Sequence, residues 1–445
     1  MMNRLVGVCF LMMLPACDAD KSDTGAIEPV SDDTGTSSDA DADADADGGP
    51  VGEELTWHED VQPMVEKHCT RCHYAGGLGI GNFQDAEVVD AMAEIMLSRI
   101  DSGEMPPPVS DPECRDYVGS GHLTMPQESR DVFSAWIDGG KLRGDPADTP
   151  EIEPIIETLA DPDMIVQLPM PYTPTFEDTE NPGNEYRCFV LDPELEETTF
   201  LTAMAPQVDQ KALVHHIVLF TKNVDDITEE ELSPDGYSCI DDGMADGING
   251  MVAGWAPGAL PVEFPEGHGM RLTPDDRLIL QMHYFQSGPE VVGVADQTGY
   301  AFRTAPEVDR RVMMYPIGLY DFTIPAGDEN YTDGFEFTLP PGIGFDILAA
   351  FPHMHVLGKG YRLWADTAED GRECVLESDQ YDFDNQQTYM FKEPLSVQAG
   401  DTLGFECTWD NSADNPDQFF DEPQDIRYGE RTNEEMCFTF TLIGL

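Results

Sequence analysis

The chain has few basic residues and no apolar run long enough to span a bilayer. Its 445 residues include 23 Lys and Arg against 87 Asp and Glu, which gives a formal net charge of -64. Because a phosphate backbone is bound by clustered Lys and Arg, this balance excludes nucleic acid as a partner. The apolar run at residues 5–14 is too short to cross a membrane as a stable helix, and no later segment is more apolar.

The N-terminus has the pattern of an export signal. Arg4 precedes the apolar run at 5–14, which ends in Leu-Pro-Ala-Cys at Cys17. This ending resembles a bacterial lipobox, in which the Cys is acylated and becomes the mature N-terminus. We therefore expect a lipoprotein signal peptide at 1–16, lipidation of Cys17, and an exported protein of the bacterial cell envelope, periplasm-facing or on the outer surface. Membrane association would then be through the lipid anchor only. The alternative is ordinary cleavage near Ala16.

The next two stretches differ sharply in composition. Residues 17–54 are Ser, Thr, Gly and Asp, with Asp-Ala repeats, and have almost nothing to bury; they predict a disordered acidic tether. Within 55–148, apolar residues recur at three- and four-residue spacing over 57–69, 86–101 and 126–140. This spacing predicts a small all-α domain.

The remainder of the chain predicts β structure. A Pro-rich acidic linker at 149–169 is followed by many short alternating or β-rich runs bounded by Gly, Pro, Asn and Asp. About 275 residues are too many for one small sandwich, so we expect two tandem antiparallel β-sandwich domains of jelly-roll type, at 170–305 and 306–445.

A C-x-x-C-H run at Cys69, Cys72 and His73 has the spacing of c-type haem attachment. Two thiols bond to the vinyl groups, and the adjacent His reaches the iron from one face. The alternatives are a thioredoxin-like pair or half of a zinc site. A zinc site needs a second Cys/His pair nearby, which Cys114 alone does not supply.

The sixth iron ligand is expected to be a methionine, since His/Met ligation favours electron transfer. The region resembles the compact bacterial cytochrome c family, in which a Met-Pro-Pro loop supplies the axial sulfur before a last helix. Met105 in "GEMPPP" fits that pattern, with the last helix at 128–138 and Trp136 in the core. Met125 in "LTMPQ" is the alternative.

Five histidines lie in three apolar strand-like segments. His353 and His355 are two apart, so in a strand both project from one face. His215 and His216 are adjacent, and such a pair converges only where a bulge interrupts the strand. His283 lies in a third segment. Imidazole clusters suit copper, zinc or iron, and a thioether ligand points to copper.

The order of motifs from about residue 170 to the end resembles the ascorbate-dependent type II copper monooxygenases, which include dopamine β-monooxygenase and the peptidylglycine α-hydroxylating enzymes. The motifs stand at His215-His216, Gln281-Met282-His283-Tyr284, His353-Met354-His355 with Leu357-Gly358, and Glu435-Met436-Cys437. The resemblance implies two copper ions. One would be held by His215, His216 and His283, and the oxygen-binding one by His353, His355 and Met436.

The resemblance also implies a disulfide between Cys407 and Cys437 that braces the methionine loop. The remaining pairing of Cys114, Cys188, Cys239 and Cys374 is not readable from the sequence, although Cys188 with Cys239 is the first choice on domain grounds.

Three phenylalanines stand where the resemblance places substrate contacts. The amidating enzymes carry an Arg two residues before the H-x-H motif, and Asn and Tyr after the ligand Met. Here these positions are Phe351, Phe438 and Phe440. A carboxylate would be desolvated in such a pocket, so we expect an apolar or aromatic substrate. Core packing is the alternative reading of the three residues.

These expectations combine into a haem c domain fused to a two-copper monooxygenase that hydroxylates a C–H bond of a small organic substrate with O2. Electrons would come from ascorbate or another one-electron reductant, from a redox partner protein, or through the covalent haem. The alternative function is a non-catalytic electron carrier or copper-binding protein, and a haem-based sensor is a weaker third.

Overall fold

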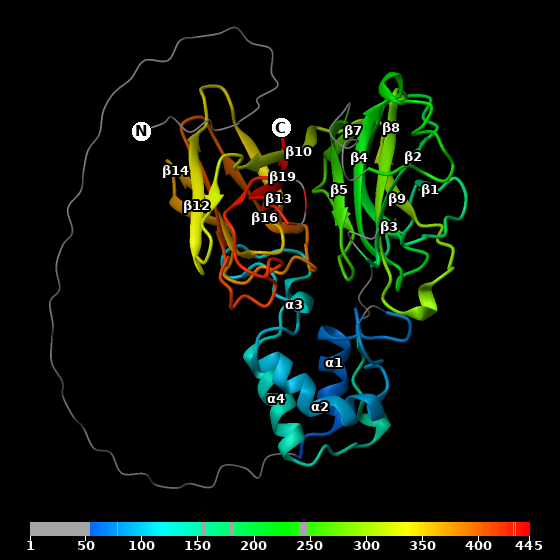
Figure 1. The fold of residues 1–445 in the computed structure, drawn as a ribbon, viewed down its shortest axis with the longest axis vertical. Helices are drawn as coiled ribbons and strands as arrows, with labels where there is room; N and C mark the ends of the chain where they lie inside the picture. The colour runs from blue at the N-terminus through cyan, green and yellow to red at the C-terminus, as the bar shows by residue number, and fades with distance from the viewer. Residues whose placement is uncertain are drawn as a thin grey trace, which may run out of the picture. The chain divides into compact units, whose positions relative to one another are not determined.

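The computed structural model describes residues 54–77, 79–152, 157–177, 182–239, 248–429, 431 and 433–445. The predicted signal peptide, Cys17 and all of the predicted tether except Glu54 lie outside the described residues. β structure predominates in the described chain and helices are few, which confirms the prediction at that level (Figure 1). None of the described helices combines the length and apolarity needed to cross a bilayer.

The α-helices of the described chain lie between Gln62 and Asp138, and this helical part has a core of its own. Asp85 caps the longest of them, since its carboxylate accepts a hydrogen bond from the backbone N–H of Glu87 at 2.9 Å. Trp57, Phe133 and Trp136 are at most 2% exposed in this core. The elements are η1 (Trp57–Val61), α1 (Gln62–His68), α2 (Ala86–Asp101), α3 (Ser120–Leu123), α4 (Gln127–Asp138) and η2 (Pro146–Asp148).

The first set of strands forms two layers over a shared apolar core. One layer has the order β2-β8-β4-β5, and the other contains β1-β9-β3-β7 with β6 beside β3. Phe189, Leu219 and Phe302 are fully buried between them. The elements are β1 (Met164–Gln167), β2 (Asn184–Leu191), β3 (Thr199–Gln207), β4 (Val214–Asn223), η3 (Val224–Asp226), β5 (Ile248–Trp255), β6 (Val262–Glu263), β7 (His268–Leu272), β8 (Asp276–Phe285), η4 (Pro289–Val291) and β9 (Gly299–Ala305).

The later strands repeat this two-layer arrangement. The order β12-β17-β14-β15 faces β10-β19-β13-β16, and Phe405 and Trp409 are fully buried in the core. The elements are β10 (Arg310–Gly318), β11 (Thr323–Ile324), β12 (Tyr331–Thr338), β13 (Phe345–His353), β14 (Gly358–Thr367), β15 (Gly371–Ser378), β16 (Tyr389–Val397), β17 (Thr402–Trp409), β18 (Ile426–Arg427) and β19 (Phe438–Gly444).

One sheet runs through both sets of strands. β7 and β10 pair in parallel, with His268 opposite Arg310 and Met270 opposite Val312. This pairing joins the first and second halves in a single nine-stranded sheet. The predicted boundary between 305 and 306 therefore stays a prediction, because backbone hydrogen bonding continues across it.

A segment from the helical part, residues 108–118, is bound to the later strands, and we call it the strap. Val118 donates its backbone N–H to Met390 at 2.8 Å, and Lys392 donates to Asp116 at 3.0 Å, so the strap extends the sheet beside β16. Tyr117 is fully buried in the core of the later strands.

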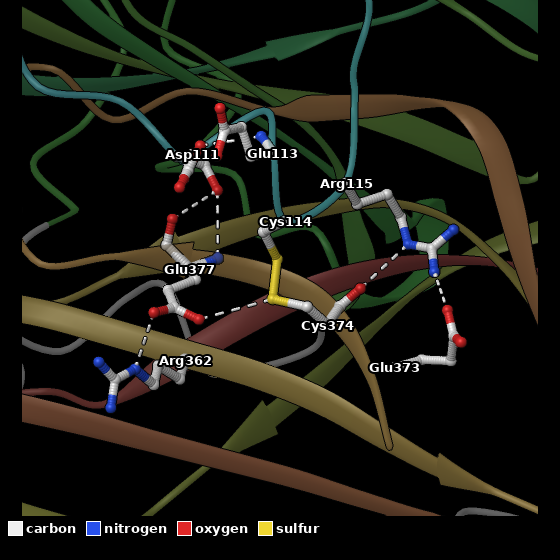
Figure 2. The surroundings of a disulfide bond; sticks show 9 residues. Asp111, Glu113, Cys114, Arg115, Arg362, Glu373, Cys374 and Glu377 are labelled. Atoms are coloured by element: carbon white, nitrogen blue, oxygen red, sulfur yellow. Dashed lines mark hydrogen bonds and ion pairs between the residues drawn. A yellow bond between two sulfur atoms is a disulfide. The ribbon is translucent and has the colours of Figure 1, made fainter. Parts of the chain in front are cut away.

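A disulfide between Cys114 and Cys374 ties the strap to β15 (Figure 2). Beside it, Arg115 donates from Nε to the carbonyl of Cys374 at 3.3 Å and forms an ion pair with Glu373 at 3.2 Å. The strap is thus held to β15 by a covalent bond, a hydrogen bond and an ion pair.

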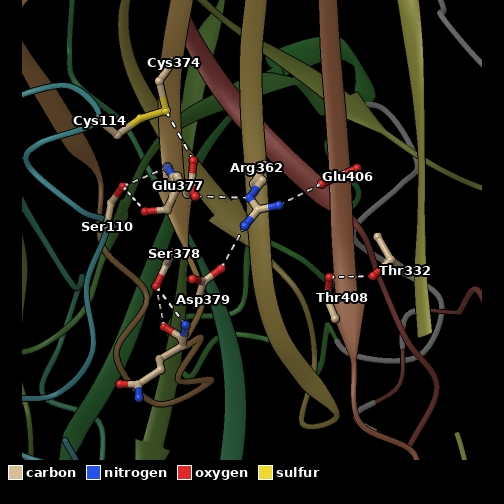
Figure 3. A network of polar contacts seen from close by, with 11 residues as sticks. Ser110, Cys114, Thr332, Arg362, Cys374, Glu377, Ser378, Asp379, Glu406 and Thr408 are labelled. Atoms are coloured by element: carbon tan, nitrogen blue, oxygen red, sulfur yellow. Dashed lines mark hydrogen bonds and ion pairs between the residues drawn. A yellow bond between two sulfur atoms is a disulfide. The ribbon is translucent and has the colours of Figure 1, made fainter. Parts of the chain in front are cut away.

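The strap also contacts β15 through Ser110, which bonds to Glu377. Its hydroxyl donates to the carbonyl of Glu377 at 2.9 Å and accepts the Glu377 N–H at 3.2 Å (Figure 3). The Glu377 carboxylate then pairs with Arg362 of β14 at 3.1 Å. This network joins the strap to the interior of the sheet.

Candidate functional site

The first histidine cluster is built by the pairing of β4 with β8. The register runs from Val214 opposite Tyr284 to His216 opposite His283, which leaves His215 as an extra residue in β4. This is a β-bulge, and it turns two adjacent imidazoles towards one point. One nitrogen from each of His215, His216 and His283 lies within 4.8 Å of the others.

Hydrogen bonds to the outer ring nitrogens of His216 and His283 fix which nitrogen these two rings present. His283 donates from Nε2 to Oδ1 of Asn184 at 2.8 Å, and His216 donates from Nε2 to the carbonyl of Asp384 at 3.3 Å. In the neutral rings the Nδ1 lone pairs are therefore available. Nδ1 of His215 and Nδ1 of His283 lie 3.3 Å apart. Metal–nitrogen bonds of about 2.0 Å at a tetrahedral angle give a separation of about 3.3 Å, so the cluster fits a metal ion.

Burial keeps these rings neutral. It lowers the pKa of His216 to about 3, with the neighbouring His215 contributing, and lowers the pKa of His283 well below its usual range. Burial also lowers the pKa of His215. Because only the neutral imidazole can donate a lone pair, the environment holds all three residues in the form that binds metal.

The second cluster contains His353 and His355, whose ring centroids lie 5.2 Å apart at 82°. The sequence suggested that a strand would orient both, but β13 ends at His353 and His355 lies beyond it. The rings converge for a different reason. His353 donates from Nδ1 to Oε1 of Gln386 at 2.6 Å, and His355 donates from Nδ1 to the carbonyl of Glu434 at 3.0 Å. Both Nε2 atoms are left to bind metal.

Glu435 joins this cluster to Met436. Its carboxylate is fully buried and accepts the backbone N–H groups of His355 at 3.0 Å, Leu357 at 2.8 Å and Met436 at 3.3 Å. The indole N–H of Trp409 is a fourth donor at 3.0 Å. One buried acceptor thus holds the H-x-H segment and the methionine segment together.

The disulfide between Cys407 and Cys437 lies next to this network and fixes the residue after Met436 to β17. A second disulfide, between Cys188 and Cys239, ties β2 to the segment that follows β4. The structure therefore contains the pair that the resemblance implied and the pair that domain grounds favoured. Cys114 with Cys374 is the third.

Phe351, Phe438 and Phe440 share one face of the sheet with His353. Phe351 is directly opposite Phe440, and His353 is opposite Phe438, in neighbouring antiparallel strands. The ring centroids of Phe351 and Phe440 lie 6.0 Å apart, and those of His353 and Phe440 lie 6.3 Å apart. Phe351 and Phe438 are 7% and 4% exposed, so the aromatic surface beside His353 is largely enclosed.

The C-x-x-C-H residues lie at the end of α1. Cys69 and Cys72 are the described cysteines without a disulfide, and burial raises the pKa of the Cys69 thiol to about 12. His73 donates from Nδ1 to the carbonyl of Ile80 at 2.9 Å, and its ring stacks on Phe83 at 4.2 Å. The Nε2 lone pair of His73 is left available, and Cys69 and Cys72 both carry free thiols.

The two candidate sulfur ligands differ in exposure. Met105 follows α2 on a loop and is 38% exposed, whereas Met125 is 5% exposed within the helical core.

The sequence analysis named the histidines and Met436 but did not name the residues that orient the rings. Each of these lies far in the sequence from the histidine that it contacts, and only the Glu of the E-M-C motif belonged to a recognised pattern. These residues are Asn184, Asp384, Gln386, Glu434 and Glu435.

Comparison with known proteins places these clusters in a family. The model for the N-terminal domain of copper type II ascorbate-dependent monooxygenase matches residues 175–289, and the model for its C-terminal domain matches residues 333–442. Together they cover about half of the chain. The first range contains the β4–β8 histidines, and the second contains His353, His355 and Met436. The helical part lies outside both.

Curated relatives agree with the family models. DBH-like monooxygenase protein 1 of Homo sapiens is 25% identical over 292 residues, 59% of this chain and 44% of that protein. DBH-like monooxygenase protein 2 of Mus musculus is 26% identical over 52% of this chain and 38% of that protein, and dopamine beta-hydroxylase of Equus caballus is 26% identical over 51% and 40%. The matches span less than half the length of these relatives. The chain belongs to the copper type II ascorbate-dependent monooxygenase family.

Proposed function

We propose that this protein is a copper-dependent monooxygenase that hydroxylates a C–H bond of a small organic substrate. In the balanced reaction, R–H, O2, two electrons and two protons give R–OH and water. The observation that carries the proposal is the pair of pre-oriented imidazole clusters. In the first, two rings are held for binding through Nδ1, and in the second, both rings are held for binding through Nε2.

The donor sets suggest different roles for the two clusters. His215, His216 and His283 would hold the copper that receives electrons. His353, His355 and Met436 would hold the copper that meets O2, and the soft thioether of Met436 favours the reduced ion. Copper at these sites supplies one-electron redox chemistry and the activation of dioxygen.

The protein's own contribution is orientation and the exclusion of water. Gln386 and Glu434 fix the rings of His353 and His355, and Glu435 fixes the backbone around them. His355 and Glu435 are 4% and 0% exposed, so these polar contacts are shielded from solvent. Such a shell holds the ligand geometry constant while the oxidation state of the metal changes.

We propose that the substrate is apolar or aromatic. The shared face of Phe351, Phe438 and Phe440 beside His353 supports this, because an anionic group placed there would lose its hydration without a charged partner. The same face would favour a flat or aliphatic group next to the second cluster.

We further propose that the helical part holds one covalent haem c. Thioethers would form at Cys69 and Cys72, and His73 would bind iron through Nε2, as its hydrogen bond to Ile80 favours. Met105 is proposed as the opposite ligand, since it is 38% exposed on a loop, whereas Met125 already fills the helical core. The haem would deliver electrons to copper, with ascorbate or a redox partner protein as the external donor.

Export and anchoring complete the proposal. Residues 1–16 would be removed, and acylated Cys17 would hold the protein in the bacterial cell envelope. Mass spectrometry of the mature N-terminus tests this directly: a diacylglyceryl-modified Cys17 supports the anchor, and an unmodified N-terminus near Ala16 contradicts it.

The enzyme proposal is tested with the purified haem- and copper-loaded protein. With saturating ascorbate and a panel of aromatic and aliphatic substrates, we expect oxygen uptake matched by hydroxylated product. His353→Ala should abolish both, while His268→Asn, a histidine outside both clusters, should retain them. Two bound coppers with no product from any substrate, and no His353-dependent oxygen uptake, would instead support a non-catalytic electron carrier.

A further inference from the structure

The loop between β15 and β16, residues 379–388, contacts both histidine clusters, and we call it the junction loop. The carbonyl of Asp384 accepts the Nε2–H of His216 at 3.3 Å. Two residues later, Oε1 of Gln386 accepts the Nδ1–H of His353 at 2.6 Å. One short stretch of chain is therefore hydrogen-bonded to a ring of each cluster, through the Asp384 backbone and the Gln386 side chain.

The residue between these two reaches the helical part. Nδ2 of Asn385 donates to the carbonyl of Pro108 at 2.9 Å. At the start of the loop, a Cβ placed on Gly103 would lie 3.3 Å from the side-chain oxygen of Gln380, so Gln380 lies against Gly103. These two contacts flank Met105, the proposed iron ligand, on both sides in sequence.

Three consecutive residues thus connect the methionine segment with both clusters. From Met105, three prolines lead along the backbone to the carbonyl of Pro108. That carbonyl accepts a hydrogen bond from Asn385, the backbone leads from Asn385 to Gln386, and the Gln386 side chain is hydrogen-bonded to His353. Towards the N-terminus, the backbone leads from Asn385 to Asp384, whose carbonyl accepts a hydrogen bond from His216. Every step is a covalent bond or a hydrogen bond, with no gap across empty space.

The junction loop is held in one conformation by its own contacts. The hydroxyl of Tyr381 accepts the backbone N–H of Met354 at 3.1 Å and donates to its carbonyl at 2.8 Å. Gln386 and Gln387 are 8% and 3% exposed, and Gln387 donates to Oδ1 of Asn385 at 2.9 Å. The amide of Asn385 is therefore oriented before any cofactor binds.

The strap fixes the opposite side of the junction. It continues directly from Pro108 and is held to β15 by the Cys114–Cys374 disulfide and to β16 by backbone hydrogen bonds. The backbone N–H of Ser110 also donates a hydrogen bond to the hydroxyl of Tyr389 in the later strands, at 3.0 Å. The Pro108 carbonyl is thereby kept next to the loop that faces the histidines.

We propose that the junction loop is the route by which electrons pass from the haem to copper at the two histidine clusters. The inference rests on the proposed function, in which both cofactors are bound. In each transfer Fe(II) is oxidised to Fe(III) and Cu(II) is reduced to Cu(I), and no atom changes its bonding partner. Two transfers supply the two electrons that each hydroxylation requires.

The route is tested in the full-length, haem- and copper-loaded protein without oxygen. The haem is reduced photochemically in a rapid pulse, its reoxidation is followed by absorbance, and the loss of Cu(II) is followed by electron paramagnetic resonance. Asn385→Leu keeps the size of the side chain but removes the hydrogen-bond donor to Pro108. We expect internal haem oxidation to slow several-fold, with copper content and haem spectrum unchanged.

Asn330→Leu is the matched control, because it makes the same chemical change on an exposed loop of the later strands and should leave the rate at the wild-type value. If Asn385→Leu lowers the yield of folded protein, Asn385→Asp is the second variant, since it keeps the shape and also lacks the donor. Wild-type rates in whichever variant folds would overturn the proposed route alone. A wild-type haem that stays reduced beside Cu(II) would overturn the route and the haem part of the proposed function together.

Discussion

The carboxylate of Glu435 accepts the backbone N–H of His355 at 3.0 Å in the interior of the protein. The same group accepts the N–H of Met436 at 3.3 Å, so one carboxylate joins two proposed ligands of one metal. Burial raises the pKa of Glu435 to about 8. The four N–H donors act against burial and favour the ionised form, so the group serves the site by accepting hydrogen bonds at fixed positions.

Replacing Glu435 with Ala should remove the copper of the second cluster and destabilise the fold. Four donors would lose their acceptor in a buried place, and leaving such groups unsatisfied costs about 3 kcal/mol or more. The copper content should fall from two ions per chain to one, and denaturant unfolding should show a lower free energy of unfolding. Glu434→Ala is the control, because His355 bonds to its backbone carbonyl, which the substitution retains. Full copper occupancy in Glu435→Ala would contradict the positioning role.

His68 should make the protein less stable in acid. The side chain is 3% exposed, its Nδ1 has no hydrogen-bond partner among the described residues, and burial lowers its pKa to about 4. Above pH 6.5 the ring is neutral in both states and contributes nothing. As the pH falls from 6.5 to about 4, His68 is protonated in the unfolded chain but stays neutral in the folded protein, so the free energy of unfolding decreases.

The full effect is about 3 kcal/mol, at 1.36 kcal/mol per pH unit. Urea unfolding of wild type and His68→Leu at several pH values isolates this contribution from that of other groups. We expect the free energy of unfolding to fall less steeply with decreasing pH in the variant than in the wild type. Parallel curves for the two proteins between pH 6.5 and 4 would show that His68 does not titrate as its burial indicates.

Local sequence patterns predicted the structure correctly where its physical cause lies within a few residues. The helix predicted over 86–101 has these bounds in the structure, because apolar spacing and the Asp85 cap both operate within a few residues. The bulge at His215 was expected from two adjacent histidines in an apolar strand, and the register shift in β4 places it there.

Contacts between distant segments could not be predicted in the same way. The convergence of His353 and His355 was attributed to a continuous strand, but it depends on Gln386 and on Glu434 and Glu435, which are 33 to 80 positions away. The attachment of the strap to β15 joins residues 260 positions apart. Neither spacing nor composition encodes such pairings, since many cysteines and acceptors are available to each partner.

The Cys114–Cys374 disulfide should contribute measurably to stability. It closes a loop of 260 positions, and long closed loops restrict the unfolded chain most, so we expect Cys114→Ser with Cys374→Ser to lower the free energy of unfolding by about 2–4 kcal/mol. Non-reducing peptide mapping should first show the two cysteines linked in the wild type. The other two disulfides should persist in the variant. An unchanged unfolding midpoint would mean that the hydrogen bonds of the strap suffice without the covalent bond.

Asn184 should control the affinity of the first cluster for copper. Its Oδ1 accepts the Nε2–H of His283 at 2.8 Å, and this bond selects the tautomer whose Nδ1 faces His215. In Asn184→Leu, His283 would lose that preference and its ring orientation. Loss of such a partner typically weakens metal binding about 10- to 100-fold, so one of the two coppers should be removed by a chelator at a correspondingly lower concentration. The copper held with Met436 should titrate as in the wild type, since Asn184 belongs to β2 and makes none of the contacts of that cluster. Equal weakening of both coppers would show a general loss of structure, and unchanged titration of both would show that the Asn184 hydrogen bond does not govern how His283 binds metal.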